Sequence, residues 1–322
     1  MKEFLITGVS GQDGRLMAEA LIELGCRVTG TTRSQKKAEI SKIARSHSDK
    51  VKVISLDPEK ASDWQELISQ KTFDGIFHFS AQSSVGSSFQ DTLENIVSPC
   101  FATYAMLEAI RDHSPNTKVI LANSTEVFGS HGKLKVKEDT PKKPESPYAV
   151  GKANMEAIAL FYRYAHGLWV SNVFLSNHES VYRSQKFVTM KIVRGAHDIS
   201  CKKKSILKLG NLAVVRDWGW APEYIDAIIA LMNMDAPRDI IIATGKSITL
   251  QNFAAEIFSF FNLSIKDYVE TDSRLLRTSD PNEAYYCIKR AEDVLKWNPK
   301  YKGVKVPRKL SSSYLRSIAE NV

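Results

Sequence analysis

The sequence predicts an α/β protein with a doubly wound parallel sheet and a smaller C-terminal α/β domain. Two observations predict this fold class: short apolar segments alternate with helix-like segments, and a glycine-rich turn follows the first apolar segment. The 322 residues are 43% hydrophobic and 25% charged, which is ordinary for a soluble globular protein. Alternation of this kind is typical of parallel sheets whose strands are connected by helices. The length allows one large or two modest domains.

The glycine-rich turn stands between the first predicted strand and the first predicted helix. Lys2 to Thr7 predicts a buried strand, and Gly8-Val9-Ser10-Gly11-Gln12-Asp13-Gly14 follows it directly. Leu16, Ala20, Leu21 and Leu24 have the spacing of one helical face, and Gly25 is suited to end that helix. Glycines here let a backbone approach a pyrophosphate, although the spacing differs from the more usual Gly-x-Gly-x-x-Gly. We therefore expect a dinucleotide site that contains Gly8, Gly11, Gln12, Asp13 and Gly14.

The end of the second strand bears on the choice of cofactor. This strand, Arg27 to Thr31, ends at Thr32-Arg33-Ser34. Many dinucleotide sites have an acid at this point that holds the ribose 2′-hydroxyl, whereas an Arg accommodates a 2′-phosphate. Arg33 has no neighbouring acid in the sequence, so we expect NADP, with NAD as the alternative. The alternative is that Arg33 is an exposed loop residue without a role in binding.

Strand-like and helix-like segments continue to alternate after this point. The strands are predicted at Val51–Leu56, Gly75–Phe79 and Lys118–Ala122, and the helices around Trp64–Gln70 and Cys100–Arg111. Ligands of doubly wound sheets bind at the carboxyl ends of the strands. Because they follow strand ends, four further residues are expected at the cofactor site: Asp57, Ala81, Gln82 and Ser83.

Two stretches carry residue types suited to acid–base chemistry. Ser146-Pro147-Tyr148-Ala149-Val150-Gly151-Lys152 places a phenol and an ammonium four residues apart at the start of a helix-like run, and therefore on one helical face. A nearby positive charge favours the phenolate of Tyr148, because an ordinary phenol has a pKa near ~10. The fifth strand ends in Asn123-Ser124-Thr125-Glu126, whose hydroxyl and carboxylate would face the same cleft. Alone, each stretch has a plainer interpretation, as a solvated helix or as a loop acid.

The second half of the chain predicts a return to the main sheet and a separate smaller domain. A helix is expected at Tyr224–Met234 and a strand at Asp239–Ala243. We expect residues 1–173, with a return segment at about 213–245, to form an NADP-binding domain of the Rossmann type. Residues 174–212 and 246–322 would then form a nucleotide-sugar-binding domain. Its core is expected to include Phe253, Ile257, Phe258, Phe260 and Phe261.

Composition limits the partners of this protein. The net charge of +8 comes partly from Lys36-Lys37, Lys133 to Lys143 and Lys202-Lys203-Lys204, which we interpret as solvated loop charge and not as a nucleic-acid surface. The apolar runs are too short to span a bilayer, and no signal peptide fits in front of the first strand. Four widely spaced cysteines, Cys26, Cys100, Cys201 and Cys287, are expected to be reduced and buried, with no metal site. We expect a cytoplasmic location.

The motifs together resemble the extended short-chain dehydrogenase/reductases, over nearly the whole chain. Within that superfamily the sequence is most similar to the GDP-mannose 4,6-dehydratases. The stretches that carry this likeness are Gly11-Gln12-Asp13-Gly14, Ala81-Gln82-Ser83, Ser146-Pro147-Tyr148-Ala149, Asn177-His178-Glu179-Ser180, Phe187-Val188-Thr189, Gly210-Asn211-Leu212, Arg216-Asp217-Trp218-Gly219 and Ala243-Thr244-Gly245.

The resemblance implies a redox-neutral lyase in which one bound nicotinamide cofactor serves every turnover. Tyr148 would take the proton of the sugar's C4 hydroxyl, Ser124 would support the ketone, Lys152 would assist Tyr148, and Glu126 would remove the C5 proton so that water leaves from C6. It also implies cofactor contacts at His178 and Arg183. Substrate contacts of the GDP-sugar would be Ser83, Asn177, Lys191, Arg216 and Arg277, and the protein would be a homodimer or homotetramer.

Several departures from the family pattern leave alternatives open. Ser124 stands where the family has Thr, Val181-Tyr182-Arg183-Ser184 stands where it has Pro-Arg-Arg-Gly, and Gly151 replaces the usual Ala. In an exposed helix interior that glycine would cost about 1 kcal/mol. One alternative is an NAD(P)-dependent oxidoreductase or epimerase, such as a 4-keto reductase or C4 dehydrogenase, acting on a related GDP-sugar such as GDP-manno-heptose. The other is a cofactor-binding protein without chemistry.

Overall fold

The computed structural model describes residues 1–33, 49–81, 85–276 and 283–320. Ser34, Gln82, Ser83 and Arg277 lie outside these ranges, and so does the basic pair Lys36-Lys37. The roles expected for Gln82, Ser83 and Arg277 therefore stay predictions.

The chain divides into two compact units. The first consists of Met1–Val127, Lys142–Leu175 and Ile225–Ile240, and the second of Phe128–Pro141, Ser176–Tyr224 and Ile241–Val322. Residues 213–224 and 241–245, which we expected in the dinucleotide domain, belong to the second unit. Internal contacts of that unit hold them, since Ile248 pairs with Arg216 in antiparallel register and the Thr244 amide donates to Asp217 Oδ1 over 2.9 Å. Which unit binds the cofactor and which the sugar remains a prediction.

A parallel sheet forms the centre of the first unit. The strand order is β11-β6-β5-β4-β1-β2-β3. Thr7, at the end of β1, pairs in register with Thr31 of β2 on one side and with His78 of β4 on the other, so the carboxyl ends of these strands lie together. The predicted doubly wound sheet is confirmed. Its strands are β1 (Glu3–Thr7), β2 (Arg27–Thr32), β3 (Val51–Ser55), β4 (Gly75–His78), β5 (Lys118–Ser124), β6 (Val170–Leu175) and β11 (Ile240–Ile242).

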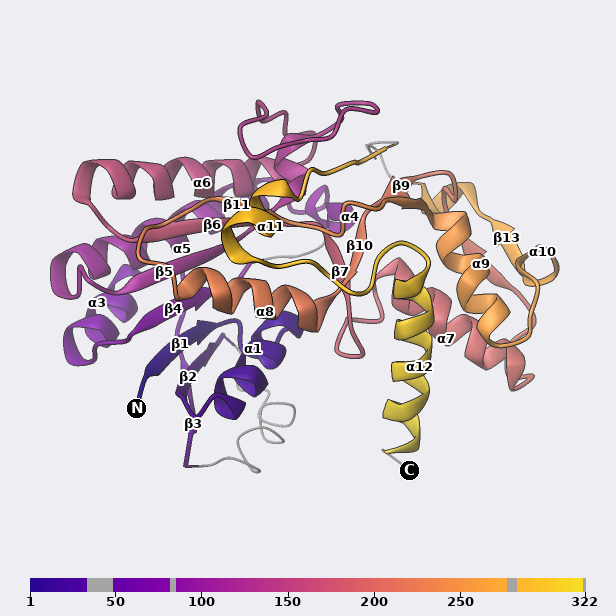
Figure 1. The fold of residues 1–322 in the computed structure, drawn as a ribbon, viewed down its shortest axis with the longest axis horizontal. Coiled ribbons are helices and arrows are strands. Elements are labelled where there is room, and N and C mark those ends of the chain that lie inside the picture. Colours follow the sequence, from indigo (N-terminus) through magenta and orange to yellow (C-terminus); the bar gives the residue numbers. More distant parts are fainter. Residues whose placement is uncertain (34–48, 82–84, 277–282, 321–322) are drawn as a thin grey trace. The chain divides into compact units, whose positions relative to one another are not determined.

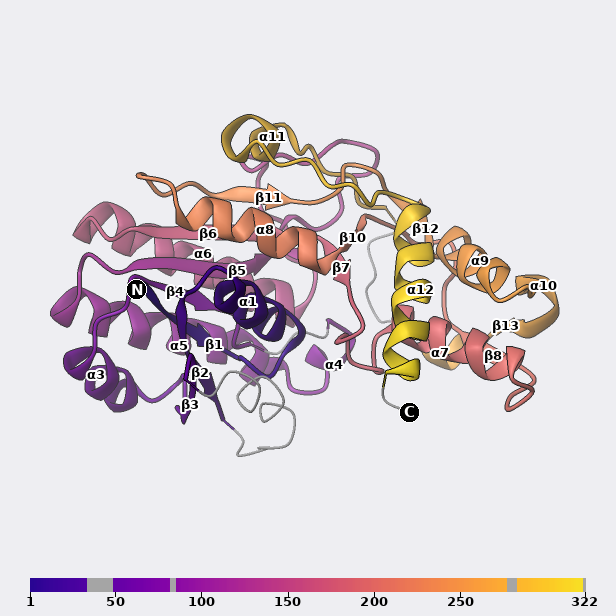
Figure 2. The ribbon, with the colours of Figure 1, turned by 60° about the horizontal axis from the view of Figure 1, so that its bottom comes forward.

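Helices cover both faces of this sheet (Figures 1 and 2). One layer contains α3, α5 and α6, and the other contains α1 and α8. Trp64 of α3, Met106 of α5 and Met155 of α6 share one buried core with Leu5 and Val119 of the sheet. The helices that include residues of this unit are α1 (Gln12–Glu23), α3 (Ala61–Gln70), α4 (Val85–Ser88), α5 (Thr92–His113), α6 (Pro147–His166) and α8 (Ala221–Met232), and the 3-10 turn η1 (Thr125–Phe128) follows β5.

Helix α1 buries a different face from the one that we predicted. Its buried apolar residues are Met17, Ala18, Leu21 and Ile22, whereas Leu24 is 63% exposed. The buried face continues the line of Gly14, the residue at which the helix passes closest to the glycine turn. Gly25 has φ +78°, as expected for the left-handed residue that ends a helix. The prediction of the helix and its end was therefore right, and that of its face was partly wrong.

One lysine of the predicted solvated runs is not simply solvated. Lys142 Nζ lies 3.1 Å from the Glu156 carboxylate of α6 and 5.0 Å from the centre of the Phe174 ring. Burial raises the pKa of Glu156, and the charge of Lys142 opposes that rise. Lys142 therefore anchors the segment that leads into α6 onto the helix itself.

The second unit is built around a helical core with short paired strands. Ile192 and Ile257 share this core with Trp218 and Leu310. Phe253, Ile257 and Phe258 are fully buried as predicted, whereas Phe260 is partly exposed. The elements are β7 (Asn177–Glu179), α7 (Val188–Ser200), β8 (Leu207–Leu209), β9 (Val215–Arg216), β10 (Trp218–Trp220), β12 (Ile248–Thr249), α9 (Leu250–Phe260), α10 (Ile265–Tyr268), β13 (Val269–Thr271), η2 (Ser273–Leu275), α11 (Lys289–Leu295) and α12 (Lys305–Ala319).

Two further expectations concern the chain as a whole. All four cysteines are free, but Cys201 is exposed and the other three are half-buried, so the prediction that they are buried was wrong. Cys201 lies directly after the end of α7, where the chain turns at the surface. Within the described residues, no helix has the length and apolar character needed to cross a membrane.

Candidate active site

The glycine turn brings the backbone of β1 and α1 unusually close together. Gly8 has φ +68°, and the Gly11 amide donates to Gly8 O over 2.9 Å. A Cβ on Gly14 would lie 2.4 Å from Gly8 O and 2.6 Å from Val9 Cα, so only glycine fits there. The residue before α1 is Gly11, which has no side chain to cap the helix. The amides of the first turn are therefore left to other partners. This is the backbone geometry that accommodates a phosphate at a helix N-terminus.

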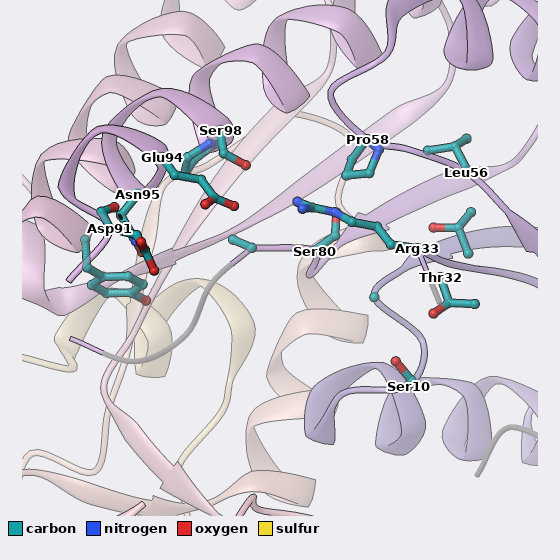
Figure 3. Close-up of a pocket in the computed structure, with 15 residues that line it drawn as sticks. Ser10, Thr32, Arg33, Leu56, Pro58, Ser80, Asp91, Glu94, Asn95 and Ser98 are labelled. Carbon is teal, nitrogen blue, oxygen red and sulfur yellow. Dashed lines mark hydrogen bonds between the residues drawn. The ribbon is translucent and has the colours of Figure 1, made fainter. Parts of the chain in front are cut away.

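A cavity of about 450 Å³ opens beside this turn (Figure 3). Ser10, Thr32, Arg33 and Pro58 line one end, and Asp91, Glu94 and Asn95 line the other. Gly8, Ala81 and Tyr148 also line it, so three predicted cofactor residues (Gly8, Arg33 and Ala81) and the predicted base share one space. The size and the mixed polar lining are those of a site for a small molecule or cofactor.

Tyr148 and Lys152 have the predicted arrangement on one helical face. Ser146 caps α6 by accepting a hydrogen bond from the Ala149 amide over 3.1 Å, and Pro147 begins the helix, which places Tyr148 in its first turn. Lys152 Nζ lies 6.0 Å from the centre of the Tyr148 ring and donates to Ala122 O over 2.6 Å. Lys152 is only 6% exposed. Burial lowers its pKa to about 8, while the charge of Asp13 opposes that shift.

The end of β5 presents a hydroxyl and a carboxylate. Ser124 is buried, and Glu126, two residues later in η1, is half-buried. The Glu126 amide donates to Ser124 Oγ over 3.2 Å, which fixes the turn between the two side chains. Among the described residues, Tyr148 alone of the four predicted catalytic side chains lines the cavity of Figure 3.

Asn123 connects the end of β5 to α6, a connection that we did not predict. Its Oδ1 accepts from the Ser124 amide over 2.8 Å, and its Nδ2 donates to the backbone oxygen of Lys152 over 3.1 Å. The residue is 2% exposed. One amide therefore fixes Ser124 relative to the helix that carries Tyr148 and Lys152. A polar residue directly after the apolar run from Val119 to Ala122 was the only signal in the sequence.

A buried histidine, His78, contacts Thr7 at the carboxyl end of β1. His78 Nδ1 is 3.1 Å from Thr7 Oγ1, which in turn accepts from the Ser80 amide over 3.1 Å. Burial lowers the pKa of His78 to about 3, and the positive charge of Lys152 adds to that effect. His78 is therefore neutral at physiological pH, and its Nδ1 shares a hydrogen bond with the Thr7 hydroxyl.

Close packing of α6 against α5 explains the glycine at position 151, which we did not anticipate. The residue is buried, and a Cβ there would lie 2.2 Å from the backbone oxygen of Asn95 in α5. Pro99 has no amide to donate to that oxygen, because proline lacks the N–H that a helix uses four residues on. The expectation of an exposed helix position at Gly151 was wrong. The glycine lets α6 approach α5 at the point where Pro99 interrupts its bonding.

Arg33 has an acidic partner that the sequence did not reveal. Its Nη2 lies 3.1 Å from Glu59 Oε1, so Arg33 has an acid beside it in space although it has none beside it in the sequence. The acid comes from the segment after β3, whose end lies beside that of β2. Asp57 lies at this edge as expected. It is exposed, and its Oδ1 accepts from the Glu59 amide over 3.1 Å.

The remaining predicted residues belong to the second unit. His178 is buried, donates from Nδ1 to Ser176 O over 2.7 Å and stacks on Tyr224 with ring centres 4.9 Å apart. Arg183 lies 3.6 Å above the Phe187 ring and 3.6 Å from the Glu179 carboxylate. Arg216 is buried and donates to Val215 O over 2.9 Å. Asn177 and Lys191 are half-buried, and burial lowers the pKa of Lys191.

The sheet, the glycine turn and the Tyr148–Lys152 pair together define a short-chain dehydrogenase/reductase of the extended type. Solved structures with the same fold include dTDP-glucose 4,6-dehydratase from Bacillus anthracis in complex with NAD, with TM-score 0.84, 20% identity and 98% and 97% of the two chains covered. UDP-glucose 4-epimerase from Thermus thermophilus in complex with NAD has TM-score 0.83 and 18% identity, with 97% of this chain and 99% of that chain covered.

The family within this class follows from sequence comparison. Residues 5–309 match the family described as GDP-mannose 4,6 dehydratase. GDP-mannose 4,6 dehydratase 2 from Arabidopsis thaliana is 34% identical over 308 residues, which are 92% of this chain and 82% of that protein. GDP-mannose 4,6-dehydratase from Yersinia enterocolitica is 35% identical over 261 residues, 79% of this chain and 70% of that protein. The chain belongs to the GDP-mannose 4,6-dehydratase family.

Proposed function

We propose that this protein is a GDP-mannose 4,6-dehydratase that uses a bound nicotinamide dinucleotide and releases a GDP-4-keto-6-deoxy sugar. Family membership supports the substrate. The observation that carries the chemistry is the buried Lys152 ammonium beside Tyr148, on a helix that Asn123 ties to the Ser124 end of β5. A base, its activating charge and a second hydroxyl are thereby held on two neighbouring elements.

In this proposal the phenolate form of Tyr148 takes the proton of the sugar's C4 hydroxyl. The Lys152 ammonium, with a pKa of about 8, is mostly charged at neutral pH, and its charge favours the phenolate in a poorly hydrated setting. Ser124 donates a hydrogen bond to the same oxygen as it becomes a ketone. General acid–base groups of this kind accelerate reactions by roughly 10²–10⁴-fold.

Glu126 is the residue that turns an oxidation into a dehydration. The C4 ketone acidifies the C5 hydrogen, so a carboxylate can remove it as a proton. Glu126 then gives a proton to the departing C6 hydroxyl, which leaves as water. When bound, a nicotinamide ring would supply the acceptor for the C4 hydride and the donor of a hydride to C6, while C5 regains a proton equivalent to the one that Tyr148 took from the C4 hydroxyl. The reaction is thereby redox-neutral, and the half-buried side chain of Glu126 remains accessible enough to exchange its proton.

We assign the dinucleotide to the first unit because the residues of that unit suit the binding of a dinucleotide. Gly14 lets the start of α1 lie directly against the Gly8–Val9 backbone, which suits the approach of a pyrophosphate to the helix N-terminus, and the cavity extends from Arg33 to Tyr148. Gly8, Gly11, Gln12, Asp13, Gly14, Asp57 and Ala81 are assigned to its binding. Arg33 favours NADP, since its guanidinium suits a 2′-phosphate.

The GDP-sugar is assigned to residues of the second unit that bear charge or hydrogen-bonding groups. Asn177, Lys191 and Arg216 remain the proposed contacts, and Arg216 offers the planar fork that binds phosphate. His178 and Arg183 remain proposed cofactor contacts, with Arg183 already held by Glu179 and Phe187. We also propose a homodimer or homotetramer, in which exposed apolar residues of the packed pair α5 and α6, among them Phe101 and Phe161, would be covered.

Replacement of Glu126 by Gln tests this assignment. The variant keeps the size of the side chain but has no carboxylate to accept the C5 proton. We expect the variant to lose the ability to release water from GDP-mannose while it keeps some oxidation at C4. The oxidation is followed by the absorption of the reduced nicotinamide ring. Unchanged dehydration by this variant would contradict the role of Glu126.

A further inference from the structure

Glu59 is held in place by two residues of the cofactor cavity. Its Oε1 lies 3.1 Å from Arg33 Nη2 and accepts a hydrogen bond from Ser98 Oγ over 2.7 Å. Arg33 and Ser98 both line the cavity, and Figure 3 shows them on different walls of it. The carboxylate of Glu59 therefore connects Arg33 to the α5 wall of the cavity, although Glu59 itself is not among the residues that line the cavity.

The turn that carries Glu59 is well defined by its own hydrogen bonds. Asp57 Oδ1 accepts from the Glu59 amide over 3.1 Å, and the Lys60 amide donates to Asp57 O over 3.1 Å. The indole of the buried Trp64 donates to Pro58 O over 2.9 Å. Glu59 is consequently presented by an ordered turn at the carboxyl end of β3, beside the end of β2 that leads to Arg33.

We propose that Glu59 determines how strongly this protein prefers NADP over NAD. The proposal rests on the assignment of a nicotinamide dinucleotide to this cavity. A 2′-phosphate would meet the Arg33 guanidinium only in competition with Glu59, and it would experience the repulsion of that carboxylate. A 2′-hydroxyl can instead donate a hydrogen bond to a carboxylate, which is the usual role of an acid at this end of such sites.

The two side chains thus oppose each other in selecting the cofactor. Arg33 attracts the doubly charged phosphate of NADP, and Glu59 weakens that attraction while offering an acceptor to NAD. Both side chains are partly exposed, at 49% for Arg33 and 35% for Glu59, so the ion pair can open without the loss of a buried contact. The site accepts both dinucleotides, and Glu59 narrows the difference between their affinities.

Equilibrium binding of NADP⁺ and NAD⁺ to the purified protein tests the proposal. Isothermal titration calorimetry gives both dissociation constants for the wild-type protein, for Glu59→Gln and for the control Glu66→Gln. The control makes the same change in net charge at an exposed position of α3. In Glu59→Gln the preference for NADP over NAD should rise by about tenfold, because a negative charge close to the 2′-phosphate is removed. Glu66→Gln should leave the preference within about twofold of wild type, since distant exposed charges are screened.

The dependence on salt provides a second readout. The gain in NADP affinity of Glu59→Gln over wild type should shrink between low salt and about 0.5 M salt, because the interaction is electrostatic. A ratio that is the same in Glu59→Gln and wild type would overturn the proposal and leave the proposed function intact. An equal shift in Glu66→Gln would also overturn it. Failure of both dinucleotides to bind the wild-type protein would overturn the proposal and the proposed function together.

Discussion

The two ends of the cofactor cavity are built in different ways. At the Tyr148 end, the neighbouring Lys152 is 6% exposed; its ammonium donates to Ala122 O of β5, and its backbone oxygen accepts from the Asn123 side chain. At the Arg33 end, two partly exposed side chains form an ion pair, and the half-buried Ser98 hydroxyl donates to one of them, Glu59. A buried, fully bonded site keeps its geometry, as acid–base chemistry requires, whereas an exposed ion pair can reorganise around a ligand. We therefore expect changes at the first end to affect catalysis and stability, and changes at the second to affect binding alone.

Removal of the Tyr148 hydroxyl should have the largest effect. Tyr148→Phe keeps the ring but leaves no base for the C4 hydroxyl, so kcat should fall by roughly 10²–10⁴-fold. Tyr164→Phe is the matched control, because it makes the same change at a 79% exposed position of the same helix. Both are compared by product formation from GDP-mannose. Full activity of Tyr148→Phe would remove the chemistry from this end of the cavity.

The buried histidine makes the rigid end sensitive to acid. His78 has a pKa of about 3 in the folded protein and the ordinary 6.5 when unfolded, so between these values the unfolded chain binds the extra proton. Stability is therefore lost as the pH falls below 6.5, by about 2–3 kcal/mol between pH 6.5 and pH 4.5. Urea unfolding at both pH values should show a smaller loss in His78→Gln. An equal loss in the variant would assign the acid sensitivity to other groups.

Asn123→Ala should weaken the connection between β5 and α6. The Ser124 amide and the Lys152 carbonyl would lose their buried partner, at a cost of about 1–3 kcal/mol in the free energy of unfolding. Because Ser124 would also lose its fixed position, kcat should fall at temperatures at which the variant is fully folded. Thermal unfolding and kcat are measured on the same preparation. A destabilised variant with unchanged kcat would show that Asn123 supports the fold without positioning the site.

Gly151→Ala distinguishes helix propensity from packing. Propensity alone would stabilise α6 by about 1 kcal/mol, whereas the contact of a new Cβ with Asn95 O should destabilise the protein by about 1–3 kcal/mol. The sign of the change in unfolding free energy decides between them. An increase in stability would mean that α5 and α6 do not approach each other as closely as described.

The smallest expected effect on stability is at the Arg33 end. Glu59→Gln breaks an ion pair whose members are both partly exposed, and such pairs contribute about 0–1 kcal/mol. Urea unfolding without a dinucleotide should hardly distinguish this variant from wild type, even where its cofactor preference changes. A loss of several kcal/mol would show that this end is as tightly built as the other.

The features that follow from local sequence were predictable, and those that depend on chain folding were not. Tyr148 and Lys152 share a face because a helix has a fixed period, and Gly14 lies close to the Gly8–Val9 turn because a strand, a turn and a helix follow in order. The pairing of Arg33 with Glu59 depends on which strands are neighbours, and sequence spacing does not encode that contact. The same holds for the Asn95 oxygen beside Gly151, which made a buried glycine look like an exposed one. The face of α1 was misjudged at Leu24 because the last turn of a helix need not follow its buried stripe.

The central claim is the dehydration of GDP-mannose, and the mass of the product tests it most directly. Purified protein is incubated with GDP-mannose and a catalytic amount of NADP⁺, with no added reductant, and the sugar nucleotide is analysed by mass spectrometry. Loss of one water, with no net change in the oxidation state of the cofactor, is the predicted result. A product of unchanged mass, or one formed only with stoichiometric reduction of the cofactor, would contradict the account.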